Sequence, residues 1–229
     1  MRSIVLAAVF VIASESIVLA QDSLKVEAGK KAPPESVSAA IRATLTDNMY
    51  RIVDGQGRAI LEIWTREGLP AATKPTGPKD AILYPFLTPG ELLGACVIPS
   101  EVQDYRDQPI SKGVYTLRYG LQPVNGDHLG VSTHRDYSLL VPAAKDQSLE
   151  RLARKPLEEK SAEAAGTSHP AVFLLLAAPE GADRAKPSMV HDSEKNTWSV
   201  VFPWRLKLQG ETAVISFPVR MVVMGAAQT

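Results

Sequence analysis

The chain has 229 residues, with 25 Lys and Arg against 25 Asp and Glu, so its formal net charge at pH 7 is zero. This balance excludes the basic surface of a nucleic-acid-binding domain and the steering of ligands by net charge. The single cysteine, Cys96, cannot form an internal disulfide, and its apolar neighbours predict an inert buried thiol. A chain of this length can bury a core without disulfides, and we expect it to do so.

Residues 1–20 have the pattern of a cleaved export signal. A basic residue starts the segment, residues 4–13 are apolar, and Ala20 is a small residue ahead of a polar stretch. The apolar run is shorter than the roughly 20 residues of a membrane-spanning helix, and Glu15 follows it closely. Cleavage after Ser16 and a buried N-terminal strand or helix are the alternatives. The pattern predicts a periplasmic or secreted protein with no membrane span after cleavage.

Residues 21–46 are mostly polar, which predicts a flexible leader with a short helix at 38–46. Strand signals begin after this leader. Segments 50–53 and 59–64 flank the sequence Asp54-Gly55-Gln56-Gly57. Glycines supply the positive φ that a tight turn requires, so these residues predict a β-hairpin.

Residues 67–89 are rich in proline, glycine and lysine and predict a long loop. Residues 148–165 are the one clear helical segment, and Pro156 is expected to break it into two short turns of a solvated excursion. Pro203 and Pro218 predict edge strands or bulges, because proline cannot donate a ladder hydrogen bond. The other strands are predicted at 92–98, 114–121, 137–141, 172–176, 197–202, 205–208 and 212–224.

Many short strands separated by turn residues, with little helical periodicity, predict an all-β fold. We expect a single antiparallel β-sandwich or jelly-roll-like domain over residues 47–229, with one short helical excursion. No internal repeat and no shift in composition divides this segment into two domains.

The sequence Lys112-Gly113-Val114-Tyr115-Thr116-Leu117 resembles the Pro-Ala-Gly-x-Tyr-x-Leu strand entry of uncharacterised secreted bacterial β-sandwich proteins. The stretches 126–130 and 135–137 are similar to hypothetical exported proteins of environmental bacteria. The resemblance covers about residues 90–145, and Ser111-Lys112 stands where that family has Pro-Ala. It implies a β-sandwich fold and an exported location, and it implies no catalytic residue.

Histidine and aspartate residues around 127–136 give a candidate metal site. In an extended segment His134 and Asp136 point to the same face, and His128 lies a few residues before them. Imidazole and carboxylate groups are ligands for a transition metal, and His169 is a candidate further ligand. The spacing matches no known metal-binding motif, so turn-capping and surface histidines remain the alternative.

An exposed aromatic side chain could instead bind carbohydrate. Trp204 follows Pro203 and is the tryptophan expected at the surface, which makes it the candidate ligand-binding residue. The alternative is that the aromatic residues face the core. A serine hydrolase is disfavoured because Ser132 lies in no Gly-x-Ser-x-Gly turn.

These patterns favour an exported, non-catalytic binding or envelope-associated module, with carbohydrate or another envelope protein as its partner. The alternative function is a metal-dependent enzyme that uses the site around residues 127–136. An assembly subunit that pairs through its edge strands is a third hypothesis.

Overall fold

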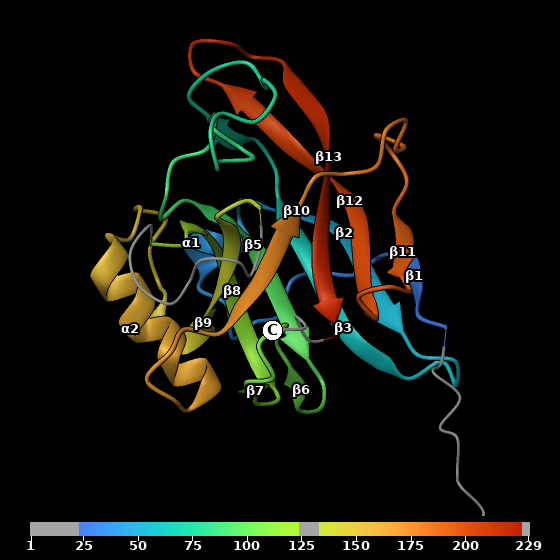
Figure 1. The fold of residues 1–229 in the computed structure, drawn as a ribbon. Helices are drawn as coiled ribbons and strands as arrows, with labels where there is room; N and C mark the ends of the chain where they lie inside the picture. The colour runs from blue at the N-terminus through green and yellow to red at the C-terminus, as the bar shows by residue number, and fades with distance from the viewer. Residues whose placement is uncertain (1–22, 124–132, 226–229) are drawn as a thin grey trace, which may run out of the picture.

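The computed structural model describes residues 23–123 and 133–225, and most of the regular structure in them is β-strand (Figure 1). The elements are β1 (Lys25–Lys30), α1 (Ala39–Arg42), β2 (Leu45–Val53), β3 (Ala59–Arg66), β4 (Leu69–Ala71), β5 (Leu92–Ile98), β6 (Val102–Gln103), β7 (Pro109–Ile110), β8 (Gly113–Leu121), β9 (Asp136–Pro142), a 3-10 turn (Ala143–Lys145), α2 (Arg154–Ala165), β10 (Val172–Leu176), β11 (Ser188–Asp192), β12 (Thr197–Leu208) and β13 (Val214–Met224).

All strands except β6 and β7 belong to one sheet, in the order β1-β2-β3-β5-β8-β9-β10-β13-β12-β11, with β4 added to β12. Every pairing is antiparallel except that of β4 with β12. The sheet curls until its two ends, β1 and β11, come into contact (Figure 1). The predicted strand-rich class is confirmed, whereas the strand order does not confirm the two-sheet arrangement of a sandwich or jelly roll.

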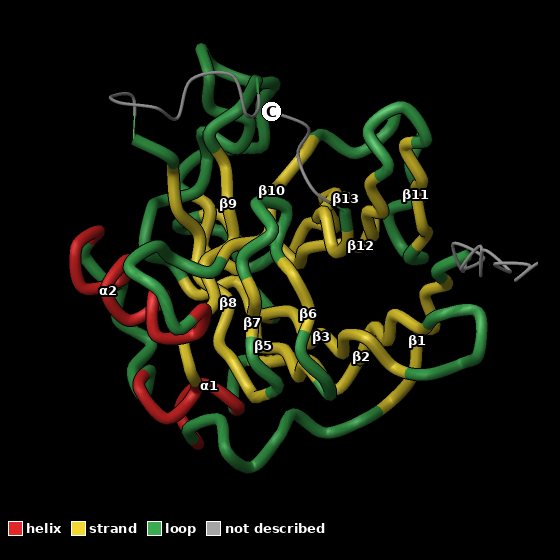
Figure 2. The backbone as a smooth tube through the Cα atoms, turned by 60° about the horizontal axis from the view of Figure 1, so that its bottom comes forward, coloured by secondary structure: helices red, strands yellow, loops and turns green. Residues whose placement is uncertain are grey.

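The main core fills the inside of the curled sheet. Tyr50 on β2 and Phe202 on β12 stand far apart in the strand order, yet their ring centroids are 5.6 Å apart. Because strands twist, a sheet with this many strands can bury its apolar face against itself. Both helices lie on the outside of the sheet (Figure 2). There Ile41 of α1 packs against β5, and Leu157 of α2 packs in a second cluster with β9 and β10.

Strand β8 is buried on both faces. Tyr115, Leu117 and Tyr119 point into the main core, as their alternation predicts. On the opposite face Arg118 is 0% exposed, and its guanidinium binds Asp146 through two hydrogen bonds of 2.6 and 2.7 Å. The other guanidinium donors bind the carbonyl oxygens of Gly90, Ser148 and Glu150. Because all of these acceptors lie outside β8, Arg118 ties the segment that leads into α2 to the sheet.

The predicted hairpin of 50–53 and 59–64 is confirmed as β2 and β3. Asp54 begins its turn by accepting hydrogen bonds from the backbone N–H groups of Gln56 and Arg58, both at 2.9 Å, and Gly57 has a φ of 77°. The prediction for the segment before it was wrong in part. Residues Lys25–Lys30 are not a flexible leader but an edge strand that pairs with β2 along its length. The short helix expected at 38–46 is present as α1.

The prediction that Pro156 breaks the helical segment was also wrong. Helix α2 is continuous and has Pro156 in its first turn, where a backbone N–H has no partner within the helix. The proline is therefore compatible with the start of the helix, which begins at Arg154. Leu157, Ser161 and Ala164 are buried, so α2 is part of the packed structure and not a solvated excursion.

Strand β12 continues through Pro203, although a break was predicted between residues 202 and 205. Pro203 lies opposite Pro218 of β13, past the end of the β11 pairing at Val201 and before the β4 pairing begins at Leu206. Each proline thus has a strand partner on one side only, as its missing N–H requires.

Within residues 23–123 and 133–225, no helix is long and apolar enough to cross a membrane. The predicted export signal at 1–20 lies outside the described residues.

Candidate functional site

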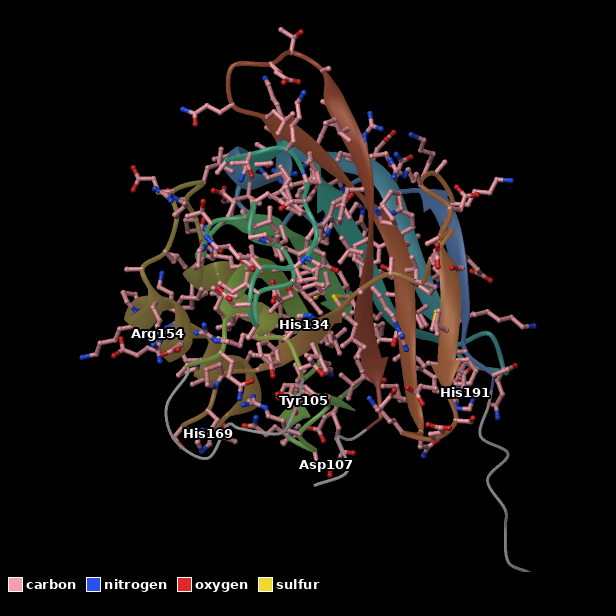
Figure 3. All side chains as sticks on the ribbon, turned by 45° about the horizontal axis from the view of Figure 1, so that its top comes forward. Tyr105, Asp107, His134, Arg154, His169 and His191 are labelled. Carbon is pink, nitrogen blue, oxygen red and sulfur yellow. The ribbon has the colours of Figure 1, made fainter. Side chains whose placement is uncertain are left out.

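A cleft of about 370 Å³ lies between α2 and the outer face of the sheet, beside the ends of β8 and β9. We call it the Tyr105 cleft. Figure 3 shows Arg154 on α2, with His169 and Tyr105 below it in this view. The described residues that line the cleft are Tyr105, Arg106, Gly120, Leu121, Gln122, Pro123, Tyr137, Leu139, Arg154, Lys155, Glu158, Glu159, Ser168, His169, Pro170 and Val172.

Two stacked tyrosines form the most distinctive part of the lining. The rings of Tyr105 and Tyr137 have centroids 5.6 Å apart and an interplanar angle of 26°. The hydroxyl of Tyr105 donates a hydrogen bond of 2.9 Å to the hydroxyl of Tyr137, which donates one of 2.8 Å to Oε1 of Gln122. Burial raises the pKa of both hydroxyls, so both stay protonated at neutral pH.

A tight turn between β6 and β7 positions Tyr105. The buried carboxylate of Asp104 accepts hydrogen bonds from the backbone N–H groups of Arg106 (2.8 Å) and Gln108 (3.1 Å). The guanidinium of Arg106 binds Asp104 at 3.2 Å and the carbonyl oxygen of Pro170, and it lies 5.7 Å from the ring centroid of Tyr105. These bonds join the turn to the chain that leads into β10, so they fix two walls of the cleft relative to each other.

The charges of the cleft are matched in pairs. Arg154 binds Glu158 at 2.8 Å, and Lys155 lies 4.0 Å from Glu159, each one helical turn apart on α2. The side chains of these two pairs are largely exposed to solvent, so the pairs contribute little to stability. Arg106 is paired with the buried carboxylate of Asp104. Each of the three Arg and Lys residues in the described lining therefore has a carboxylate neighbour.

Three of the four predicted metal ligands, His134, Asp136 and His169, are among the described residues, and they lie in different environments. Asp136 is fully buried, and its carboxylate accepts hydrogen bonds from the N–H groups of Leu83 (2.7 Å) and Tyr84 (3.0 Å) and from the hydroxyl of Tyr119 (2.6 Å). It therefore anchors the long loop before β5 to the sheet. His134 is partly buried and His169 is exposed at the cleft, and Figure 3 shows the two histidines apart.

In the part of the chain that the structure describes, no three His, Cys, Asp or Glu side chains are grouped closely enough to hold a metal ion. His128 lies outside the described residues. The transition-metal site thus stays a prediction for His128, while His134, Asp136 and His169 do not form a ligand set among the described residues.

The prediction that Trp204 is an exposed ligand-binding residue was wrong. Trp204 is 2% exposed, and its ring lies 5.3 Å from that of Tyr84 inside the main core. Because β12 runs unbroken through Pro203, Trp204 keeps the inward alternation of Phe202 and Leu206. It cannot serve as a surface platform for a sugar.

Cys96 is buried in the main core, as predicted, and burial raises the pKa of its thiol. It is therefore protonated and shielded, which is the state of an inert structural cysteine.

Tyr105 and Tyr137 were not predicted from the sequence as site residues. The alternation of β9 places Tyr137 on the outer face, opposite Asp136 and Ser138, and this signal was available. The position of Tyr105 was not, because the turn that carries it meets β9 only through contacts across the fold.

Comparison of the chain with protein-family models, curated proteins and solved structures gave no match.

Proposed function

We propose that the protein is an exported, non-catalytic binding module and that the Tyr105 cleft is its ligand site. The observation that carries this proposal is a cleft of about 370 Å³ with a buried, hydrogen-bonded tyrosine pair in its lining. This volume falls in the usual range for small-molecule sites, which combine apolar walls with a few placed polar groups.

The cleft is held by rigid elements, which supports a site that is formed before its ligand arrives. Strands β8 and β9 and helix α2 supply half of its described lining residues, and Asp104 fixes the turn that carries Tyr105. Binding to such a site does not require ordering of the protein, so less of the interaction energy is lost on association.

The buried tyrosine pair is better suited to binding a ligand than to transferring a proton. A general acid or base works best with a pKa near the operating pH. Burial moves the pKa of Tyr105 and Tyr137 upward, away from neutral pH. The carboxylates of Glu158 and Glu159 lie beside the cations Arg154 and Lys155. These groups are suited to hydrogen bonding with a ligand.

A screen of a small-molecule fragment library by ligand-observed NMR tests the binding site. The Ser168→Trp variant places a large side chain at the rim of the cleft, because Ser168 is exposed and lines it. Ser36→Trp is the matched control, since Ser36 is an exposed turn residue outside the cleft lining. We expect hits that bind the unmodified chain and Ser36→Trp but not Ser168→Trp. Hits that bind all three proteins equally, or no hits, would contradict the proposal.

Export is tested separately by the mass of the protein from cell-envelope and culture fractions. We expect a mature chain that begins after Ala20. An intact Met1 in those fractions would contradict the predicted export signal. It would not affect the proposed binding site, which the NMR screen tests independently.

A further inference from the structure

We infer that the ligand of the Tyr105 cleft is a neutral, polyhydroxylated molecule, namely a sugar unit. This inference rests on the proposed function, and it goes further by naming the class of ligand. Three features of the cleft carry it: the direction of its hydrogen-bond chain, the pairing of its charges, and the mixture of apolar and polar groups in its walls.

The hydrogen-bond chain in the lining of the cleft has one direction. Tyr105 donates to Tyr137, and Tyr137 donates to Gln122, so both hydroxyl protons are used inside the protein. The oxygen of Tyr105 accepts no hydrogen bond from any described residue. A hydroxyl oxygen has two acceptor lone pairs, so what the end of this chain offers a ligand is an acceptor. It suits a ligand that donates, such as one with a hydroxyl or amine group, and not a carboxylate, sulfate or phosphate.

The charge pairing disfavours both kinds of ionic ligand. A cleft for an anion presents cations without partners, whereas Arg106, Arg154 and Lys155 each lie beside a carboxylate. Among the described lining residues, the carboxylates of Glu158 and Glu159 each lie beside a cation, so neither is a lone partner for an ammonium group. Hydroxyl and amine groups can both donate to the oxygen of Tyr105. The neutral hydroxyl is therefore a better match than a charged amine.

The remaining walls fit the two kinds of surface that a sugar ring presents. The Arg154 and Glu158 pair offers donors and an acceptor, and hydroxyl groups can use both. Apolar side chains on the sheet side can cover the carbon-bound hydrogens of the ring. These apolar residues are Leu121, Pro123, Leu139, Pro170 and Val172.

The inference differs from the carbohydrate platform predicted at Trp204. That prediction needs an exposed aromatic face, and Trp204 has none. In the Tyr105 cleft both tyrosines are buried, and the inference places the sugar at the hydroxyl oxygen of Tyr105 and the surrounding polar groups.

Saturation-transfer NMR and calorimetry with the mature chain test this assignment. The probes are neutral mono- and disaccharides, the matching uronic acids and amino sugars, and the fragment library used for the binding site. Tyr105→Phe removes the open acceptor and keeps the ring. Tyr115→Phe is the matched control, because Tyr115 is a buried tyrosine outside the cleft whose hydroxyl donates to the carbonyl oxygen of Ser111 at 2.7 Å.

We expect a neutral sugar to bind more tightly than its uronic acid and its amino sugar, with an affinity that changes little with salt. Tyr105→Phe should weaken that binding by about three- to tenfold, as expected for the loss of one hydrogen bond. Tyr115→Phe should leave it unchanged. Circular dichroism melting curves identify any variant whose loss of binding reflects unfolding.

The other outcomes separate the two proposals. A uronic acid that binds more tightly than its neutral sugar, with an affinity that falls as salt rises, would overturn the neutral-sugar assignment and retain the cleft as a binding site. The same holds if no sugar binds while library fragments bind and are blocked by Ser168→Trp. If neither sugars nor fragments bind, both the assignment and the proposed function are overturned.

Discussion

Replacing Asp146 by alanine should lower the free energy of unfolding by about 3–5 kcal/mol, because it leaves the guanidinium of Arg118 buried without its counter-charge. The two side chains are 0% and 1% exposed. They share two hydrogen bonds, of 2.6 and 2.7 Å, and Thr116 donates a third to the same carboxylate at 2.5 Å. No solvent reaches this pair to replace the lost interactions.

The paired substitution gives a sharper test of the same reasoning. Arg118→Met alone leaves the carboxylate of Asp146 buried with Thr116 as its remaining side-chain donor, so it should also cost several kcal/mol. The double variant Arg118→Met/Asp146→Ala buries neither charge. Its cost should fall short of the sum of the single costs by about 2 kcal/mol or more.

Urea unfolding followed by tryptophan fluorescence measures these free energies, since Trp64 and Trp204 are buried in the folded protein. The exposed pair of Lys30 and Asp47, at 2.7 Å, is the matched control and should show no measurable coupling. Equal costs for the double variant and the sum of the single variants would refute the reasoning about the buried pair.

Burial raises the pKa of all six tyrosines, so the folded chain should show less tyrosinate absorbance than the urea-unfolded chain at the pH where the unfolded chain is half ionised. The free energy of unfolding should keep its full tyrosine contribution below about pH 10 and fall as the pH rises further, because the unfolded chain then releases protons that the folded chain holds. Tyrosines that ionise in the folded chain at the same pH as in the unfolded chain would contradict this. Cys96 should react with a thiol reagent only after unfolding, and fast labelling of the folded chain would show that it is accessible. Ala153→Asp should raise the free energy of unfolding by about 1 kcal/mol, because α2 begins without a side-chain cap. The introduced carboxylate can accept a hydrogen bond from the backbone N–H of Lys155. An unchanged urea midpoint would count against this account of the helix start.

The strands were predictable where local pattern decides the structure. The segments 92–98 and 172–176 are apolar runs between turn residues, and the structure has strands with the same bounds. The hairpin around Asp54 was equally clear, because its turn is fixed by neighbouring residues. In these places each side chain and each turn favours the same local conformation.

The errors lie where the wider fold decides. Lys25–Lys30 is polar and exposed, so its sequence shows no strand pattern, and its strand conformation comes from pairing with β2. Pro156 breaks a helix in its interior and is tolerated in its first turn, and the sequence alone did not locate that start. The burial of Trp204 depends on whether β12 continues through Pro203. The partner strand β13 allows this, because it places Pro218 opposite Pro203.

The candidate site shows the same limit. Its tyrosine pair joins a turn at Tyr105 to a strand at Tyr137, and its far wall is α2, so three separate segments must meet before the cleft exists. The predicted metal residues were chosen for their closeness in sequence. Of these, Asp136 instead forms hydrogen bonds with backbone groups of the loop before β5.

Ligand binding in the Tyr105 cleft is tested most directly by a crystal structure of the mature chain soaked with the fragment library and the neutral sugars. We predict electron density for a bound molecule between α2 and the ends of β8 and β9, with a hydroxyl group of a sugar within hydrogen-bond distance of the oxygen of Tyr105. Bound molecules found only elsewhere on the protein, with the cleft free of them, would contradict the account.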